Sequence, residues 1–270
     1  MVKEVAIVFP VAGLSSRFGG VKQFAKIGPN NETLIEYSLN QALKAGFSKI
    51  IFIVGEKTEH LFREKFGDNY QNTPVQYVLQ YFNPEKRDRP WGTADALCCI
   101  KNIINCPFVF CNGDDIYGEN TFRKLFNHLQ ESNECASIGY NLKDALPDEG
   151  AVHRGIFNIC EHGYVQNLIE TFNIELNNLA KDNLTPNHSC SMNIFALHPG
   201  VIDMLHEELI NFKQNNQEDR KVEFLIPTEI SRLIQNNQIR MKIHSTPDKW
   251  FGVTNPEDEA IVREMLRELS

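Results

Sequence analysis

Short apolar runs alternate with helical patterns through the first half of the chain. The apolar runs are VAIVFP (5–10), KIIFIVG (49–55), VQYVLQYF (75–82) and PFVFCNG (107–113). Segments with helical apolar spacing begin near Thr33, Lys57, Thr93 and Glu119, which gives the order βαβαβαβ. The second run is apolar on both faces, as in sheets that helices cover on both sides. The sequence therefore predicts an α/β fold with a doubly wound, Rossmann-like, mainly parallel sheet.

The second half of the chain has a mixed pattern that does not continue this alternation. Further strands are expected at CASIGYNL (135–142), RGIFNIC (154–160), YVQNLIE (164–170) and CSMNIFALHP (190–199), with EHG (161–163) as a hairpin turn. An Asn-rich segment at 173–190 predicts a mobile loop, and helices are expected at about 200–215, 227–236 and 256–269. Because the chain shows no repeat and no linker, we expect a single domain over residues 1–270. We expect residues 1–134 and 135–270 to be its two halves, of which the second covers the substrate.

Charge and hydropathy argue against two kinds of partner. The chain of 270 residues carries 27 Lys and Arg against 35 Asp and Glu, a net charge of −8, which disfavours a surface for nucleic acid. No apolar run approaches the roughly 18 residues that a membrane span needs, so no membrane partner is expected. The start reads as a strand rather than a leader, and seven cysteines without a CxxC pair are typical of buried, reduced thiols. We therefore expect a cytoplasmic protein, and the oligomeric state stays open.

Two loops with different chemistry follow the first and fourth predicted strands. VAGLSSRFGGVKQF (11–24) contains Gly13, Arg17 and Lys22, whereas CNGDDIYG (111–118) contains Asp114 and Asp115. In doubly wound sheets such loops meet beyond the carboxyl ends of the strands, where ligands bind. Glycine amides and cations suit phosphate oxygens, and carboxylates beside phosphates require a divalent ion such as Mg²⁺ between them. Together the loops predict transfer at phosphorus with Mg²⁺ as the cofactor.

A third loop, RPWGTADAL (89–97), lies on the same side and places Gly92 and Thr93 at the start of a helix. A base or a phosphate can dock there against free amides. Each loop also has a simpler interpretation. Thr93 alone fits a helix N-cap, and the two aspartates fit caps of the helix that follows them. Single cations are more often surface charges than ligands. The joint occurrence of the loops favours the binding site.

The three loops together resemble the ordered motifs of a known enzyme family. VAGLSSRFGGVKQ resembles the signature loop of the nucleotidyltransferases that join a sugar phosphate or related alcohol phosphate to a nucleoside triphosphate. WGTADA and NGDDIYG resemble the second and third motifs of that family. The later blocks RGIF, SMNIFALHP, KVEFLIPTEI and DKWFGVTNPED resemble blocks of its sugar-nucleotide branch. The resemblance therefore extends over most of the chain.

This resemblance implies a role for each motif residue. It implies that Val11, Ala12, Gly13 and Leu14 wrap the nucleotide, and that Gln80, Gly92 and Thr93 contact its base. Arg17 and Lys22 would be the catalytic cations on the triphosphate, and Asp114, with Asp115 beside it, would hold Mg²⁺. Glu170 and Asn193 would contact the acceptor. The implied partners are a nucleoside triphosphate and a phosphorylated small-molecule acceptor.

Two positions depart from the family pattern. Thr171 stands where many members have a phosphate-binding lysine, and Gly252 stands where many have a second metal-binding aspartate. Asp248 is the nearest carboxylate to the second position. We favour an arrangement without it, in which Mg²⁺ is held by Asp114, phosphates and water, because Mg²⁺ often keeps several waters. The acceptor and the preferred base stay open.

Two other functions fit parts of the pattern. A glycosyltransferase with a nucleotide-sugar donor shares the fold and an acidic metal motif, but it usually has Asp-x-Asp and lacks the loop from arginine to lysine. A nucleotide-sensing protein that has lost turnover would keep the pocket. Nucleotidyl transfer ranks first because Arg17, Lys22 and Asp114 are all present.

Overall fold

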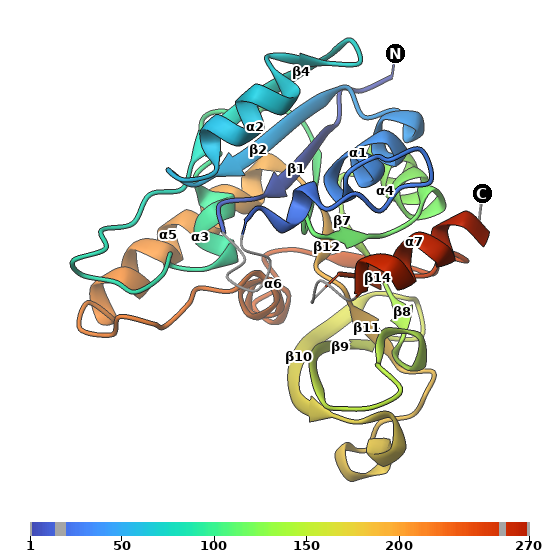
Figure 1. The fold of residues 1–270 in the computed structure, drawn as a ribbon. Helices are drawn as coiled ribbons and strands as arrows, with labels where there is room; N and C mark the ends of the chain where they lie inside the picture. Colours follow the sequence, from blue (N-terminus) through green and yellow to red (C-terminus); the bar gives the residue numbers. More distant parts are fainter. Residues whose placement is uncertain (1, 14–19, 254–257, 269–270) are drawn as a thin grey trace.

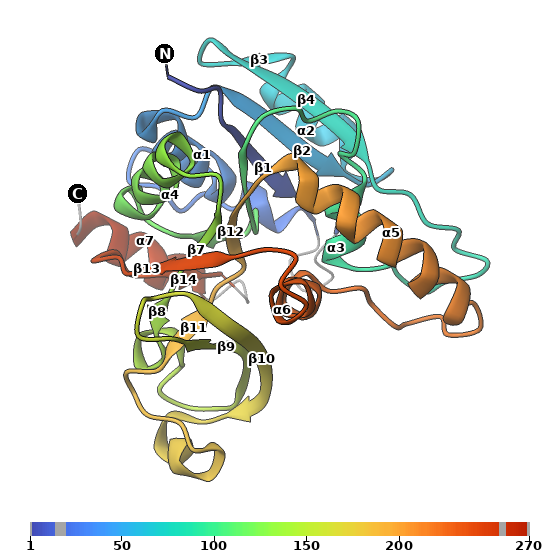
Figure 2. The same cartoon turned by 180° about the vertical axis from the view of Figure 1, so that it is seen from behind.

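The computed structural model describes residues 2–13, 20–253 and 258–268. Its main feature is an eight-stranded sheet with helices on both faces and the strand order β13-β7-β12-β5-β1-β2-β4-β3 (Figures 1 and 2). The strands are β1 (Ala6–Pro10), β2 (Lys49–Val54), β3 (Asn69–Tyr70), β4 (Thr73–Leu79), β5 (Phe108–Cys111), β7 (Cys135–Ile138), β12 (Ile194–Leu197) and β13 (Met241–His244). Only β12 and β3 run antiparallel to their neighbours in this described sheet. The predicted α/β class is confirmed.

The helices form two layers, one on each face of this sheet. One layer contains α1 (Leu34–Ala45), α2 (Glu59–Phe66) and α4 (Glu119–Glu131), and the other contains α3 (Thr93–Cys98), α5 (Pro199–Asn215) and α6 (Ile226–Gln235). Strand alternation assigns the faces, since Ile7 and Phe9 pack with the first layer and Ala6 and Val8 with the second. All four side chains are buried, so β1 lies in the centre of the core. The carboxyl end of β1 is thereby held rigidly.

Helix α1 begins at the capping box that the sequence predicts. The Thr33 backbone N–H donates to Glu36 Oε2 over 2.9 Å, and the Thr33 hydroxyl lies 2.6 Å from the same oxygen. The helix ends at Gly46, whose φ of 113° lies in the left-handed region. From the middle of α1, the Ser38 hydroxyl donates to the backbone carbonyl of Asp115 over 2.7 Å. Helix α1 therefore fixes the backbone of the acidic loop.

A small antiparallel sheet forms a second lobe beside the large one (Figures 1 and 2). Its order is β10-β9-β11-β8, with β8 (Tyr140–Asn141), β9 (Val152–Ile159), β10 (Val165–Ile174) and β11 (Ser189–Ser191). The predicted EHG hairpin joins β9 to β10. A two-stranded ladder of β6 (Asp115–Ile116) and β14 (Phe251–Gly252) lies between the lobes, and α7 (Asp258–Glu268) packs on β6, β14 and α1 through Val262 and Leu266.

The segment CSMNIFALHP is two strands rather than the single strand that was predicted. Its first residues form β11 in the small sheet, and its later residues form β12 in the large sheet. Between them Asn193 adopts a φ of 56°, a left-handed conformation that asparagine tolerates better than most residues. The predicted loop at 173–190 is also wrong in part. It contains the 3₁₀ helix η3 (Leu176–Asp182), anchored by the buried Leu179, as well as the start of β11.

Both halves of the chain contribute to the large sheet. Strand β12 pairs with β5, and β7 and β13 extend the sheet beyond it. A boundary at residue 134 therefore separates no independent sheet, and the assignment of one domain over residues 1–270 stays a prediction.

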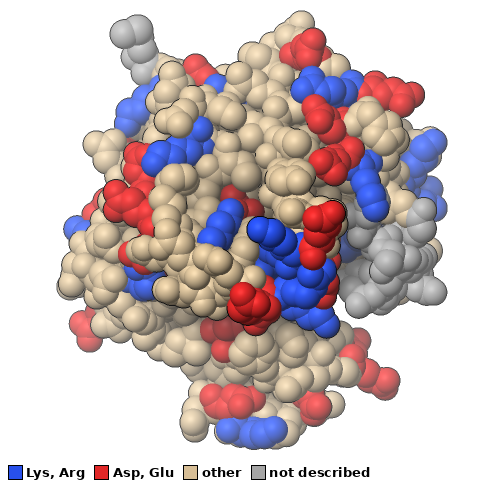
Figure 3. Space-filling view, turned by 90° about the vertical axis from the view of Figure 1, so that its left-hand side faces the viewer, with Lys and Arg blue, Asp and Glu red and all other residues tan. Residues whose placement is uncertain are grey.

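Charged side chains of both signs are mixed on the surface. On the face in Figure 3, Lys and Arg stand next to Asp and Glu, so the described part of that face offers no broad patch of one sign. Within the described ranges, every helix is too short or too polar to cross a bilayer.

Candidate active site

The loops after β1 and β5 meet at the carboxyl edge of the large sheet. Val11 continues β1 by donating its backbone N–H to Ile53 O over 2.7 Å. Gly113 packs beside it, where an added Cβ would lie only 2.6 Å from Val11 Cγ1, so any larger residue would push the two loops apart. Ala12 and Gly13 then leave the sheet, and no atom of the described residues lies within 4 Å of the position of a Gly13 Cβ. The predicted residues Leu14 and Arg17 lie outside the described residues.

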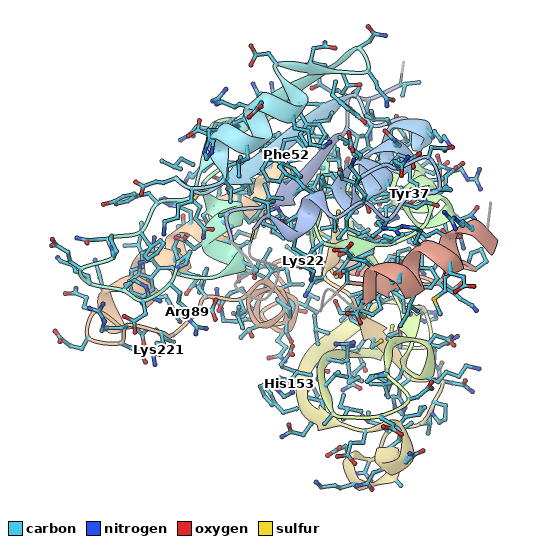
Figure 4. All side chains as sticks on the ribbon, in the orientation of Figure 1. Lys22, Tyr37, Phe52, Arg89, His153 and Lys221 are labelled. Carbon is cyan, nitrogen blue, oxygen red and sulfur yellow. The ribbon has the colours of Figure 1, made fainter. Side chains whose placement is uncertain are left out.

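Lys22 and Asp114 form an ion pair across these two loops. The Lys22 Nζ lies 2.9 Å from Asp114 Oδ2. Lys22 comes from the short 3₁₀ helix η1 (Lys22–Phe24), and its side chain is 13% exposed against 35% for Asp114. Figure 4 shows Lys22 between the large sheet and the small sheet that carries His153. The cation and carboxylate that the sequence places in separate loops are thus in direct contact.

Asp115 points into the protein rather than toward the loop. Its Oδ2 accepts a hydrogen bond from Asn112 Nδ2 over 2.9 Å and lies 3.2 Å from the Tyr117 hydroxyl. Burial raises the pKa of Asp115, and the charge of Asp114 raises it further. A carboxylate held by internal donors is a poor candidate for a metal ligand. This geometry favours Asp114 over Asp115, and both metal assignments stay predictions.

The surroundings of Asp114 suit a metal that is shared with a ligand. Among the described residues, no three His, Cys, Asp or Glu side chains cluster as a protein-only metal site would require. A partly exposed carboxylate is the kind of donor that Mg²⁺ uses when phosphates and waters complete its shell. The position of Asp114 is therefore compatible with Mg²⁺, and its role as a metal ligand stays a prediction.

The space of a side chain at position 252 is filled by the Trp250 indole. Gly252 pairs with Asp115 across β14 and β6. A Cβ on Gly252 would lie 2.5 Å from Trp250 Cη2 and 2.6 Å from Cζ2. A carboxylate at position 252 would require the indole to move away. The absence of the second family aspartate is thus built into the packing here.

Asp248 caps helix α4. Its Oδ2 accepts the Thr121 backbone N–H over 2.8 Å, and its Oδ1 accepts Asn120 Nδ2 over 2.8 Å. Thr121 is in the first turn, where N–H groups lack partners within the helix. The N-cap role that was an alternative for Asp114 and Asp115 therefore belongs to Asp248.

We expect Asp248→Ala to lower the free energy of unfolding by about 1 kcal/mol, the usual cost of a lost N-cap. The Mg²⁺ concentration for half-maximal turnover should stay nearly unchanged, because both carboxylate oxygens already accept hydrogen bonds from the helix. Urea unfolding and a Mg²⁺ titration of turnover measure the two effects. Asp248→Asn, which caps about as well as aspartate, is the control. A large rise in the Mg²⁺ requirement of either folded variant would make Asp248 a metal ligand.

Gln80, Gly92 and Thr93 lie together where β4 leads toward α3. Gln80 is buried, and its Nε2 donates to Gly92 O over 3.1 Å and to Asp95 Oδ2 over 2.8 Å. Gly92 has a φ of 107°, and a Cβ there would lie 2.6 Å from Phe224 O. Thr93 is the first helical residue rather than the N-cap, and its hydroxyl accepts the Ile226 N–H over 3.1 Å. The positive φ and the close approach to Phe224 explain the glycine at position 92. The hydrogen bond to Ile226 explains the threonine that follows it.

The predicted acceptor residues lie on or beside the small sheet. Glu170 is on β10 opposite Gly155 of β9, and burial raises its pKa. Gly155 is in turn opposite Ser191 of β11, two residues before Asn193. The same region holds Arg154, which was not predicted as a site residue. Thr171, which stands where many family members have a lysine, is directly opposite Arg154 across β10 and β9. The missing lysine is the feature of the sequence that could have drawn attention to Arg154.

Comparison with known proteins identifies the family of the chain. A sequence model described as nucleotidyl transferase matches residues 19–250. The chain belongs to this nucleotidyl transferase family. The low-salt glycan biosynthesis nucleotidyltransferase Agl11 of Haloferax volcanii is 25% identical over 194 residues, 70% of this chain. The chain spans 46% of that relative's length. The predicted family is thereby confirmed.

Solved structures share the fold of this nucleotidyl transferase. A UDP-glucose pyrophosphorylase complexed with UDP-glucose aligns with a TM-score of 0.66 at 17% identity, covering 100% of both chains. The inositol-1-phosphate CTP transferase of T. maritima aligns with a TM-score of 0.68 at 13% identity, covering 100% of this chain and 97% of that one. At these identities the likeness concerns the fold.

Proposed function

We propose that this nucleotidyl transferase joins a nucleoside triphosphate to a phosphorylated sugar or cyclitol and releases pyrophosphate, with Mg²⁺ as its cofactor. The observation that carries the proposal is the contact of Lys22 with Asp114 at the edge of the sheet. The names of two structural neighbours, a UDP-glucose pyrophosphorylase and an inositol-1-phosphate CTP transferase, support this choice of acceptor class.

The ion pair holds both charges where the substrate needs them. In the proposed complex Lys22 would bind the triphosphate, and Asp114 would hold Mg²⁺. The bound Mg²⁺ supplies charge neutralisation for the phosphate oxygens. An acceptor phosphate is already deprotonated near neutral pH, so it attacks the α-phosphorus in line without a general base. The residues of the chain then serve mainly to position the substrates and to stabilise charge.

The loop after β1 provides the rest of the proposed triphosphate site. Val11, Ala12, Gly13 and Leu14 would surround the nucleotide, and Arg17 would be the second cation on the phosphates. The open space at Gly13 supports a close approach of the ligand to the backbone. Asn193 and Glu170 would bind hydroxyl groups of the acceptor. We also place the activity in the cytoplasm, because all seven cysteines are free thiols.

The orientation of the Gln80 amide favours uracil or thymine as the base. Its Nε2 faces two acceptors, Gly92 O and Asp95 Oδ2, so its oxygen is the end available to a ligand. Helix α3 begins beside it, and the N–H groups of Thr93 and Asp95 in its first turn are donors, whereas that of Ala94 already donates to Phe224 O over 2.9 Å. This pairing of a donor with an acceptor matches O4 and N3–H of uracil or thymine. Cytosine in the same pose would present an amino donor in place of O4 and an acceptor in place of N3–H, so neither hydrogen bond would form.

We therefore expect kcat/KM for UTP or dTTP to exceed that for CTP by roughly 10-fold or more, since mismatched buried hydrogen bonds cost about 1–3 kcal/mol each. Asp95→Asn, which lets the Gln80 amide turn over, should narrow this preference while Gln80 is retained. Equal kcat/KM for CTP and UTP in the unaltered protein would contradict the assignment.

Pyrophosphate release tests the proposed function directly. The protein is incubated with Mg²⁺, each triphosphate, and glucose 1-phosphate, inositol 1-phosphate or other sugar and alcohol phosphates. Release that requires both substrates supports the proposal. Transfer of sugar from a nucleotide sugar without pyrophosphate release would indicate a glycosyltransferase instead. Tight triphosphate binding without release for any acceptor would indicate a sensor.

A further inference from the structure

Arg154 is a partly buried cation that the proposed mechanism does not use. Its Nε and Nη2 donate to Ala145 O over 3.0 and 2.7 Å, and its Nη1 donates to His153 O over 2.9 Å. These contacts use three of the five guanidinium N–H groups, so two remain. Among the described residues, no carboxylate lies within 4.0 Å of the guanidinium. The hydrogen bonds of the Arg154 guanidinium to described residues are therefore made to backbone carbonyls.

The position of Arg154 connects the small sheet with the acidic loop. Its Cζ lies 5.3 Å from the centre of the Trp250 indole. That indole packs over Gly252, the residue opposite Asp115. Burial lowers the pKa of Arg154, whereas the charges of Asp115 and Glu170 act in the opposite direction. Arg154 thus lies near enough to the predicted acceptor residue Glu170 and to Asp115 for both charges to act on it.

The indole beside Arg154 has an N–H group without a hydrogen-bond partner. The Trp250 Nε1 is buried and has no hydrogen-bond partner among the described residues. Buried donors left without acceptors are rare, and a bound water, an ion or a role in a site can account for one. A guanidinium without a carboxylate and an indole N–H without an acceptor both suit an oxyanion.

The strand register relates Arg154 to the missing family lysine. Arg154 on β9 is directly opposite Thr171 on β10. Side chains of opposed residues lie on the same face of a sheet with Cβ atoms about 5 Å apart. A long cationic side chain at either position reaches the same space. Arginine on β9 can therefore supply the charge that a lysine on β10 would supply.

We propose that Arg154 binds the phosphate of the acceptor in place of the lysine that Thr171 replaces. The inference rests on the proposed function and specifies how this chain holds its second substrate. In this arrangement Arg154 would neutralise the acceptor phosphate and Lys22 the triphosphate. The guanidinium over Trp250 also disfavours acceptors that carry an ammonium group, because like charges repel there.

Steady-state kinetics of Arg154 variants test this assignment. Arg154→Gln should raise KM for the best acceptor of the panel by about 10- to 100-fold, the range for losing one charge-assisted pair, with KM for the triphosphate changed less than about 2-fold. For Arg154→Lys, the KM for the acceptor should lie between that of the unaltered protein and that of Arg154→Gln. Arg240→Gln is the matched control, because Arg240 also packs over an aromatic ring, Tyr164, at 4.2 Å, but its charge is already paired with Glu134 over 2.8 Å.

A rescue variant distinguishes phosphate binding from a structural role. Thr171→Lys added to Arg154→Gln restores a cation but not the hydrogen bonds to Ala145 O. Recovery of the acceptor KM by at least about 5-fold supports phosphate binding. Equal KM changes for both substrates, or no recovery with lysine at position 171, would overturn the proposal and leave Arg154 as a structural residue.

Direct binding keeps the test independent of turnover. Trp250 is one of two tryptophans, so Trp91→Phe makes its emission a local reporter. Glucose 1-phosphate and inositol 1-phosphate should change this emission, whereas glucose and inositol should not, and Arg154→Gln should remove the change. A Trp250 emission that does not respond to the phosphate group when Arg154 is present, or a phosphate-dependent change that persists in Arg154→Gln, would refute the role of Arg154. Absence of pyrophosphate release together with phosphate-dependent emission would instead refute the proposed function alone.

Discussion

Lys22→Ala is expected to lower turnover by about 10² to 10³, the typical effect of removing one well-placed charge-stabilising donor. The physical reason is the position of Lys22 Nζ, 2.9 Å from Asp114 at the mouth of the loop that follows β1. In the proposed complex this cation faces the phosphates as negative charge moves to the leaving pyrophosphate. Pyrophosphate release measures turnover, and urea unfolding measures stability.

The stability of Lys22→Ala should change by only about 1 kcal/mol or less, because the 35% exposed Asp114 side chain remains open to water. Lys44→Ala is the matched control, since Lys44 pairs with Glu119 on the surface at 3.9 Å, with 69% of its side chain exposed. It should change neither property. A folded Lys22→Ala protein with unchanged turnover would refute the assignment of the loop.

Asp114→Asn is expected to remove Mg²⁺-dependent activity, lowering turnover by at least about 10², because the metal is worth several kcal/mol of charge stabilisation. The substitution keeps the size of the side chain and its ability to accept a hydrogen bond from Lys22. It removes the negative charge that a hard cation requires. Helix capping cannot explain such a loss, because α4 is capped by Asp248. Turnover over a range of Mg²⁺ concentrations is the measurement.

Asp115→Asn separates the two aspartates. Its carboxylate accepts hydrogen bonds inside the protein, from Asn112 among others, so this variant should lower stability and leave the Mg²⁺ requirement close to that of the unaltered protein. Full Mg²⁺-dependent activity in Asp114→Asn, combined with a raised requirement in Asp115→Asn, would transfer the metal role to Asp115.

The first half of the fold was predictable because its information is local. Apolar runs such as 49–55 and the capping box at Thr33 determine their own elements, and right-handed crossovers leave few ways to connect them. The split of 190–199 between two sheets was not predictable in the same way. It depends on the left-handed turn at Asn193 and on β12 entering beside β5, and neither is encoded by hydropathy alone.

The residues of the candidate site also differ in whether the sequence predicts them. Lys22 and Asp114 were predicted together because parallel strands bring their following loops to one edge. The inward orientation of Asp115 was not, since sequence spacing does not say which of two adjacent carboxylates faces the protein. The role proposed for Arg154 was not predicted, because it depends on the pairing of β9 with β10. Counting outward from the EHG turn would have placed it near Thr171, although the bulges in this hairpin limit such counting.

The insertion of β12 beside β5 has a consequence for how the protein is made on the ribosome. Until Ile194 has been synthesised, β5 is the edge of a growing sheet, with Phe108 and Phe110 along it. Such an edge is open to pairing with another chain. The loops that hold Lys22 and Asp114 emerge early, but the sheet that orients them closes late, after α4, β7 and the whole small sheet have left the exit tunnel. A nascent chain arrested between these points would expose this edge to chaperones and to aggregation.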